Sequence, residues 1–340
     1  MKKLTILIAV SFLLTSSIWA GVVKKNKSEI NFAKFGTFKT EETVKISDMK
    51  KAVDAESDFK GKGLVGKLAG KIALSSGNTG RIIDLNAMTI YEINYKKKEY
   101  KVLPIEEISY ETGEEVEEEQ AEETEYEDES DIKITKNEFK VEETGESKTI
   151  NNFPSQKYIV TWLTEWENTS TGEKGTTRLV TDVWTTPLTD EIKQCQQVET
   201  DFSRNHMKAM GIDIDQMQAD ILGTNWLSIF TQMGGEGAKA DQDTASFAQE
   251  MKKIQGYPVV IDGKFFTSKE GGEAEEEEEE SGGGLRGRLG GLAKKALSKK
   301  SDKADENVPS FSYYTEVIEL RPESLEESAF QVPANYKKKD

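Results

Sequence analysis

The residue types that most often carry catalysis are scarce in this chain, which contains one cysteine, Cys195, and one histidine, His206. A Ser-His-Asp triad would have to use His206, and the carboxylate considered for it, Asp201, stands five positions away on a different helical face. Cys195 shares an apolar stripe with Ile192 and Phe202, which favours a small buried core residue over a reactive thiol. We therefore expect no catalytic residues and a protein that is not an enzyme, although counting leaves carboxylate-only chemistry open.

Metal-binding patterns are equally sparse. One cysteine and one histidine exclude a Cys/His zinc cluster within one chain. Asp213-Ile214-Asp215 resembles the start of a calcium loop, but the glycine and the closing glutamate expected at loop spacing are missing. We expect no metal site and no cofactor. A single cysteine also excludes an intramolecular disulfide, and we expect no disulfide-linked partner.

The N-terminus has the pattern of a secretory signal peptide. Two lysines precede the apolar run Leu4 to Leu14, which is too short to span a bilayer. Ala20 then stands directly before a cleavage position at Gly21. We expect residues 1–20 to be removed and the mature product to be soluble, in the periplasm or secreted; an uncleaved membrane anchor is the alternative.

Charge is concentrated in low-complexity segments. The chain has a net charge of −17, and residues 111–130 include 12 acidic side chains in 20 positions. Such runs repel themselves and lack apolar surface, so we expect disordered insertions at about 58–78, 105–130 and 268–307 in a single domain covering 21–340.

The acidic composition argues against a nucleic-acid partner, because affinity for nucleic acid depends mainly on neutralising its phosphates. The Gly-rich basic segments allow transient contact with a membrane surface.

Alternating apolar residues predict a three-stranded meander over 79–104 and a long strand through Tyr158, Trp162 and Trp166. Thr189 has the character of an N-cap, and it predicts a helix that ends at Gly211. Further helices are expected over 214–233 and 243–254, followed by strands over 259–261 and 310–320. Strands, then helices, then strands again predict an α+β fold. We expect a curved antiparallel β-sheet, an unclosed half-barrel, with a helical block over the concave face.

Short motifs accompany these strands in a fixed order. They are Thr43-Val44-Lys45-Ile46-Ser47, Ile83-Asp84-Leu85, Ile90-Tyr91-Glu92-Ile93-Asn94, Lys98-Glu99-Tyr100, Leu103-Pro104, Thr149-Ile150-Asn151-Asn152-Phe153-Pro154, Val183-Trp184, Gly256-Tyr257-Pro258-Val259 and Phe330-Gln331-Val332-Pro333-Ala334-Asn335-Tyr336. In this order they resemble an exported bacterial family, domain of unknown function 4412, which looks like the LolA/LolB-type half-barrel. The resemblance spans most of residues 40–337. It implies the fold and the compartment, and it supplies no catalytic residues.

An apolar helix face and tryptophan-rich strands together suggest a ligand site. We expect the helix to face the concave side of the sheet and the strand aromatics to form the opposing wall: Met217, Ile221, Trp226 and Phe230 against Trp162, Trp166 or Trp184. Ordinary core packing is the alternative for the same residues. The function expected is a non-enzymatic binding or carrier protein for an apolar ligand, such as a lipid, an acyl chain or a lipoprotein. The alternative is an envelope interaction or structural protein that acts through its charged insertions.

Overall fold

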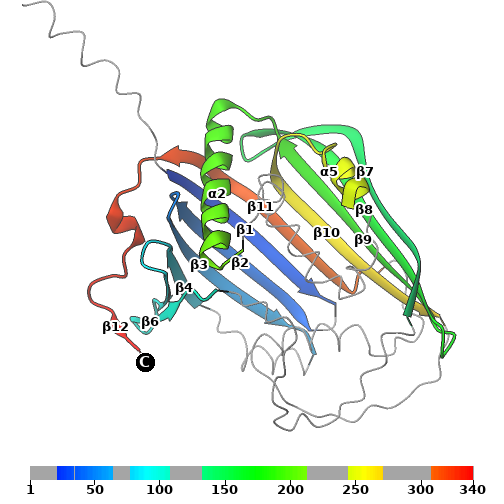
Figure 1. Cartoon of the computed structure of the whole chain (residues 1–340), viewed down its shortest axis with the longest axis horizontal. Coiled ribbons are helices and arrows are strands. Elements are labelled where there is room, and N and C mark those ends of the chain that lie inside the picture. Colours follow the sequence, from blue (N-terminus) through cyan, green and yellow to red (C-terminus); the bar gives the residue numbers. More distant parts are fainter. Residues whose placement is uncertain are drawn as a thin grey trace, which may run out of the picture.

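The computed structural model describes residues 21–33, 35–63, 77–107, 132–212, 244–270 and 308–339. Its elements, labelled as in Figure 1, are β1 (Gly21–Phe32), β2 (Gly36–Ile46), β3 (Lys50–Gly61), β4 (Gly77–Asp84), β5 (Thr89–Asn94), β6 (Glu99–Pro104), β7 (Ile132–Ile150), β8 (Phe153–Asn168), β9 (Lys174–Thr186), α2 (Asp190–Ala209), α5 (Thr244–Met251), β10 (Tyr257–Glu270), β11 (Phe311–Glu323), a 3₁₀ helix (Glu327–Phe330) and β12 (Lys337–Lys338).

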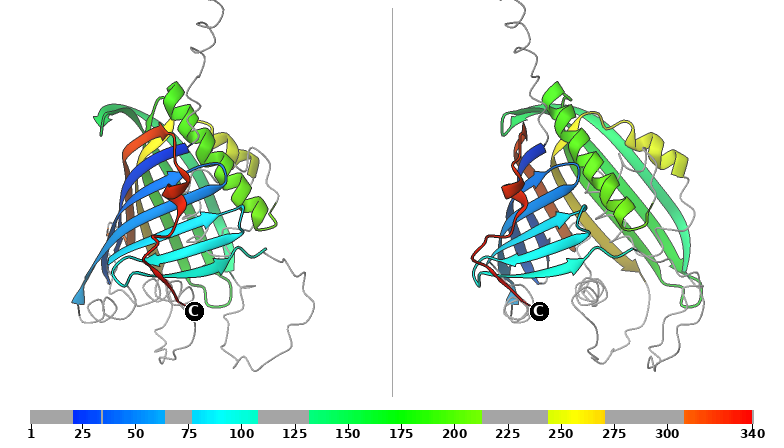
Figure 2. Two further views of the ribbon diagram at one scale, coloured as in Figure 1. Left: turned by 90° about the vertical axis from the view of Figure 1, so that its left-hand side faces the viewer. Right: turned by 60° about the vertical axis from the view of Figure 1, so that its left-hand side comes forward.

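The described strands form one sheet in the order β12-β6-β5-β4-β3-β2-β1-β11-β10-β9-β8-β7. Neighbouring strands are antiparallel, except that β12 is parallel to β6. The sheet curves strongly and stays open, with β7 at one end and β6 and β12 at the other (Figure 2). This confirms the predicted α+β half-barrel.

Strand β1 lies in the middle of the sheet and joins two meanders. Along one edge it pairs with β2, and along the other it pairs with β11 from Gly21↔Glu323 to Phe32↔Phe311. A bulge at Lys25/Asn26 interrupts the β11 side, which increases the local twist. Strands β1 to β6 form one meander and β7 to β11 form the other, so the β1–β11 ladder is the backbone link between the two halves of the described sheet.

The meander predicted over 79–104 is confirmed as β4, β5 and β6. Its two turns place Met88 and Lys98 at positive φ, 52° and 53°, as tight hairpin turns require. Asp84 supports the first turn, because its carboxylate accepts hydrogen bonds from the N–H groups of Asn86 and Ala87 at 3.0 and 3.1 Å. Polar turn residues therefore set the register of these short strands.

Helices α2 and α5 lie over the concave face of the sheet (Figures 1 and 2). The side chain of Thr189 caps α2 by accepting the N–H of Ile192 at 3.3 Å, and Gly211 follows the helix at φ 78°, so both predicted ends are confirmed. Buried Ile192, Cys195 and Phe202 pack α2 onto β1, β2 and β4. Among the described residues, neither helix is long and apolar enough to cross a bilayer.

The two ends of the sheet are protected differently. At the β6 end, the C-terminal segment runs along the convex face, where Phe330, Leu325 and Tyr336 pack on β3, β4 and β5. At the β7 end, charged side chains alternate along the strand, and the Glu250 carboxylate of α5 accepts the N–H of Val141 at 2.8 Å. Charges and a capped edge amide both discourage pairing with another chain.

Several glycines lie under aromatic rings within the sheet. A Cβ added at Gly263 would overlap the ring of Tyr313, and one at Gly175 would overlap the indole of Trp166. Both pairs are cross-strand partners. A glycine normally weakens a strand, but an aromatic ring from the neighbouring strand can cover its bare backbone. A glycine covered in this way lets the sheet curve sharply.

The ordered strands reach further than expected into the charged ranges. Strand β3 extends to Gly61, β4 begins at Gly77 and β10 continues to Glu270, so these end portions of the ranges 58–78 and 268–307 belong to strands. The predicted signal segment 1–20 and the helix expected over 214–233 lie outside the described residues.

Replacing Gly263 tests the ring-over-glycine packing. We expect Gly263→Ala to lower the free energy of unfolding by about 1–3 kcal/mol, because the methyl group forces Tyr313 out of its position. Ala is normally a better strand residue than Gly, so a loss of stability on this substitution would indicate a clash with Tyr313. Urea unfolding followed by circular dichroism measures the change. Lys264→Ala, at the adjacent exposed position, is the control, and equal stability of both variants would refute the packing argument.

Candidate functional site

A row of large apolar side chains crosses the concave face of six strands. Each member is the cross-strand partner of the next, and we call this set the aromatic row: Phe32, Phe311, Phe265, Leu179, Trp162 and Phe139. Because side chains alternate between the two faces of a strand, this register places all six on one face. They form the floor of the half-barrel beside its central strands.

One end of the aromatic row is covered by α5. Phe247 of this helix packs on Phe139, with ring centroids 4.4 Å apart, and Phe139 meets Trp162 edge to face at 6.2 Å. The indole N–H of Trp162 donates to the side-chain oxygen of Asn137 at 2.8 Å. Trp162 therefore belongs to the packed core of this half of the sheet and not to an open wall.

The other end of the row continues into residues that the described helices leave uncovered. Phe38 pairs with Ile30 on one side and with Phe59 on the other, and Val53 lies on the same face of β3. All four side chains are partly exposed. We call Ile30, Phe38, Val53 and Phe59 the open floor. On β3 the half-buried positions alternate with exposed Asp54, Glu56 and Asp58 on the convex face, so the apolar side of the strand is turned inward.

A buried polar cluster holds α2 above the sheet. The ammonium of Lys24 in β1 donates to Glu199 of α2 at 3.0 Å and to the hydroxyl of Tyr257 in β10 at 2.8 Å. The same hydroxyl donates to the other Glu199 oxygen at 2.8 Å. Burial opposes the charged ammonium, but the Glu199 carboxylate and the Tyr257 hydroxyl together outweigh it and raise the pKa of Lys24 above its ordinary value. The cluster thus joins β1, α2 and β10 as a charged, fully paired unit.

His206 has no hydrogen bond to Asp201 in the described chain, and Cys195 is buried in the core. The Asp201 carboxylate accepts from Gln197 at 2.9 Å and Arg204 at 3.0 Å, both on its own helix, and no hydrogen bond joins it to His206 within the described chain. Cys195 is fully buried, as predicted, and burial raises the pKa of its thiol to about 12. Such a thiol stays protonated and unreactive at neutral pH.

The cross-strand register places Trp162 and Trp166 on one face of the sheet and Trp184 on the other. Trp184 pairs with Lys157, a position that alternates with the aromatic row, so it lies on the convex face between the ammonium groups of Lys148 and Lys157, 3.9 and 5.9 Å from its ring. Of the three tryptophans offered for the wall, Trp184 is therefore the one that does not face the concave side. Trp184 is buried by the β7–β8 hairpin, where it packs with apolar neighbours.

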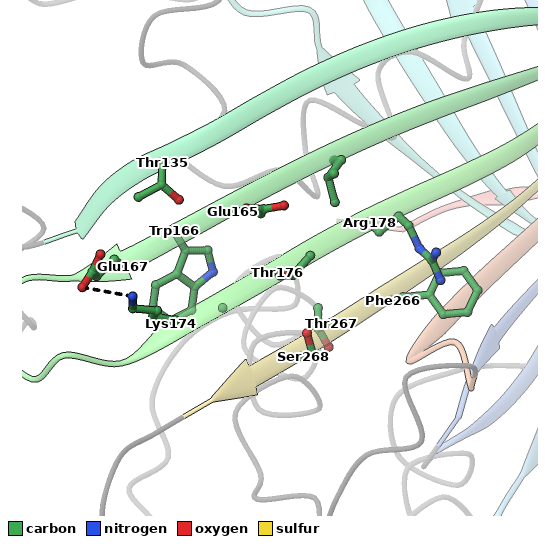
Figure 3. Close-up of a pocket in the computed structure, with 12 residues that line it drawn as sticks. Thr135, Glu165, Trp166, Glu167, Lys174, Thr176, Arg178, Phe266, Thr267 and Ser268 are labelled. Carbon is green, nitrogen blue, oxygen red and sulfur yellow. Dashed lines mark ion pairs between the residues drawn. The ribbon is translucent and has the colours of Figure 1, made fainter.

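Trp166 lies near the far end of β8, at the edge of a hollow of about 690 Å³ (Figure 3). Most of that hollow faces away from the helices, and its lining includes the ion pair between Glu167 and Lys174 at 3.6 Å. The guanidinium of Arg178 stacks on Phe266 there, 4.8 Å from the ring centroid. This polar lining belongs mainly to the convex face, whereas the register turns Trp166 itself to the same side as Trp162. Met217, Ile221, Trp226 and Phe230 lie outside the described residues.

The open floor was missed by the sequence argument. Phe38 and Phe59 stand in segments rich in Lys, Glu and Thr, and only the cross-strand register brings them together. Within the described ranges, no group of three His, Cys, Asp or Glu side chains has the geometry of a metal site. No protein-family model matches the chain, and no curated protein or solved structure is significantly similar to it.

Removing one charge of the Lys24–Glu199 ion pair tests its contribution to stability. We expect Glu199→Gln to lower the free energy of unfolding by about 2–4 kcal/mol, because Lys24 is left without its counter-charge. The double variant Lys24→Met/Glu199→Gln should recover part of that loss. Lys193→Met, which removes an exposed ion pair at the start of the same helix, should cost less than about 0.5 kcal/mol. Chemical unfolding measures all four proteins; a Glu199→Gln loss no larger than the Lys193→Met loss would refute the assignment.

His206 should make stability fall with acid. Burial, followed by the positive charges of Lys51 and Arg81, lowers the pKa of His206. The unfolded chain therefore takes up the proton first, so stability decreases as the pH falls below the ordinary imidazole value of 6.5. We expect the loss between pH 7.5 and 5.5 to be smaller in His206→Gln than in the wild type, measured by urea unfolding. Parallel pH profiles for the two proteins would contradict this.

Proposed function

We propose that this protein binds a long-chain apolar or amphipathic ligand on the concave face of its half-barrel, as a carrier and not as an enzyme. The observation that carries the proposal is the open floor, which adjoins the aromatic row on the same face and is left partly exposed by the described helices. Partly exposed apolar side chains in a concave, protected position are what an acyl chain would cover.

The arrangement of polar groups supports the same function. The described open floor contains neither the cysteine nor the histidine. Both belong to α2, where Cys195 is buried and His206 lies beside Phe202. The export and half-barrel resemblance expected from the sequence fit a protein that carries a lipid or the acyl chains of a lipoprotein through an aqueous compartment. The charged insertions remain the basis of the alternative, an envelope interaction protein.

Binding of fatty acids of graded length tests the proposal. In delipidated, folded protein, calorimetric affinity should rise by about fourfold per added CH₂ group, since each buried CH₂ contributes about 0.8 kcal/mol. Phe38→Ser and Phe59→Ser should each weaken binding at every chain length, because they remove apolar contact from the open floor.

Phe266→Ser is the matched control for these variants. Phe266 is a partly exposed phenylalanine on the opposite face, stacked with Arg178, so its loss should leave fatty-acid affinity unchanged. No binding at any chain length would refute the carrier function and favour the interaction protein. Equal losses in Phe38→Ser and Phe266→Ser would remove the open floor as the site.

A further inference from the structure

A basic hollow of about 610 Å³ lies on the concave face of β3 to β6, beyond the apolar part of β3. Most of the lining side chains, Lys51, Val53, Arg81, Glu92 and Lys101 among them, occupy the strand positions that share a face with the open floor. Five cationic side chains contribute to it: Lys51, Arg81, Lys97, Lys101 and Lys339. We call this feature the basic hollow.

Carboxylates in the basic hollow do not balance these charges. Glu92 and Glu99 are the two that line it, and Glu92 is already paired with Arg81 at 2.8 Å. Among the described residues, Lys51, Lys97, Lys101 and Lys339 have no ion pair within 4 Å. A chain with a net charge of −17 thus gathers uncompensated positive charge at one concave position. A concave cluster of one sign focuses the field and attracts counter-ions.

Lys51 is the member of this cluster closest to the helix cover. Its ammonium lies 6.0 Å from the ring centroid of Phe202 in α2, and its side chain is partly buried. Burial, together with the charge of nearby Lys24, lowers the pKa of Lys51. Lys24 forms an ion pair with Glu199, whereas Glu199 and Glu42 act on Lys51 only at longer range and do not offset its burial, so Lys51 is short of a paired counter-charge.

The basic hollow and the open floor lie on one strand. From Lys51 the concave positions of β3 run through Val53, Ala55 and Ser57 to Phe59. The eight residue-to-residue steps from Lys51 to Phe59 cover about 26 Å, which is of the order of the length of an extended long acyl chain. A ligand lying along β3 could therefore place its hydrocarbon on Val53 and Phe59 while its end reaches Lys51.

We propose that the basic hollow binds the anionic head of an amphiphile, a carboxylate or a phosphate, whose acyl chain lies on the open floor. Lys51 and Arg81 contact the head group, and Lys101 supplies further positive charge at the rim. This rests on the proposed carrier function and narrows its ligand class to anionic lipids. An uncharged lipid of equal length would leave Lys51 without its partner.

Pairs of ligands with the same acyl chain and different head groups separate the contribution of the head group from that of the chain. Palmitate is compared with hexadecanol, and lysophosphatidylglycerol with lysophosphatidylcholine of the same acyl chain, each by calorimetry below its critical micelle concentration. We expect the anionic member of at least one pair to bind roughly tenfold tighter, as charge-assisted hydrogen bonds predict. A preference confined to one pair identifies carboxylate or phosphate as the head group.

Variants then locate the preference. Lys51→Met should reduce the anionic-to-neutral affinity ratio at least about fivefold, and Lys51→Arg should retain it. Lys101→Met gives a second test at an exposed position, with a smaller reduction. Lys39→Met, which removes a lysine from the convex side of β2, is the control and should leave the ratio unchanged.

Each outcome decides between the two proposals. Equal binding of anionic and neutral ligands overturns the head-group site and leaves the carrier function intact. A ratio unchanged in folded Lys51→Met and Lys101→Met also overturns it. Failure of all four ligands to bind refutes the carrier function itself.

Discussion

The buried contact of Lys24 with Glu199 and Tyr257 is the interaction on which the arrangement of the half-barrel depends. It joins the central strand, the long helix and the other half of the sheet through one ammonium group. A buried charge is costly unless every partner is in place, so the position of α2 is fixed more narrowly than apolar packing alone would require. That position decides which concave residues are covered, and it leaves Phe38 and Phe59 partly exposed farther along β2 and β3 from the paired cluster.

The sequence alone was enough to predict strands with one apolar and one polar face, and helices with capping residues at their ends. The β4–β6 meander followed from alternating residues, and α2 followed from Thr189 and Gly211. The edge strand β7 gives only a weak alternating pattern, because both of its faces are largely exposed and rich in Lys and Glu. The first residues of β1 were missed for a related reason: Lys24 looks solvent-exposed in sequence, and only a distant carboxylate makes its burial possible.

The candidate site was less predictable than the fold, because it depends on register. In β9 the adjacent residues Val183 and Trp184 are both apolar, so composition cannot assign one of them to the concave face. The pairing with β8 decides it and places Trp184 outside. Phe38 and Phe59 were overlooked although each is apolar, since they become neighbours only after β2 and β3 pair. The face on which each of these side chains lies, and its neighbours there, follow from cross-strand pairing, which the order of residues along the chain does not reveal.

The central β1–β11 ladder also dictates the order in which the molecule can be completed. Gly21 pairs with Glu323, roughly 300 positions away, so one side of β1 lacks its neighbour until nearly the whole chain is present. Contacts of such long sequence separation close slowly. During that interval β1 presents an unpaired strand edge with Val22 and Val23 on it, a template for misassociation. A nascent or translocating chain would therefore be vulnerable until its last long strand arrives, and a chaperone that holds the first strand would shield it over that period.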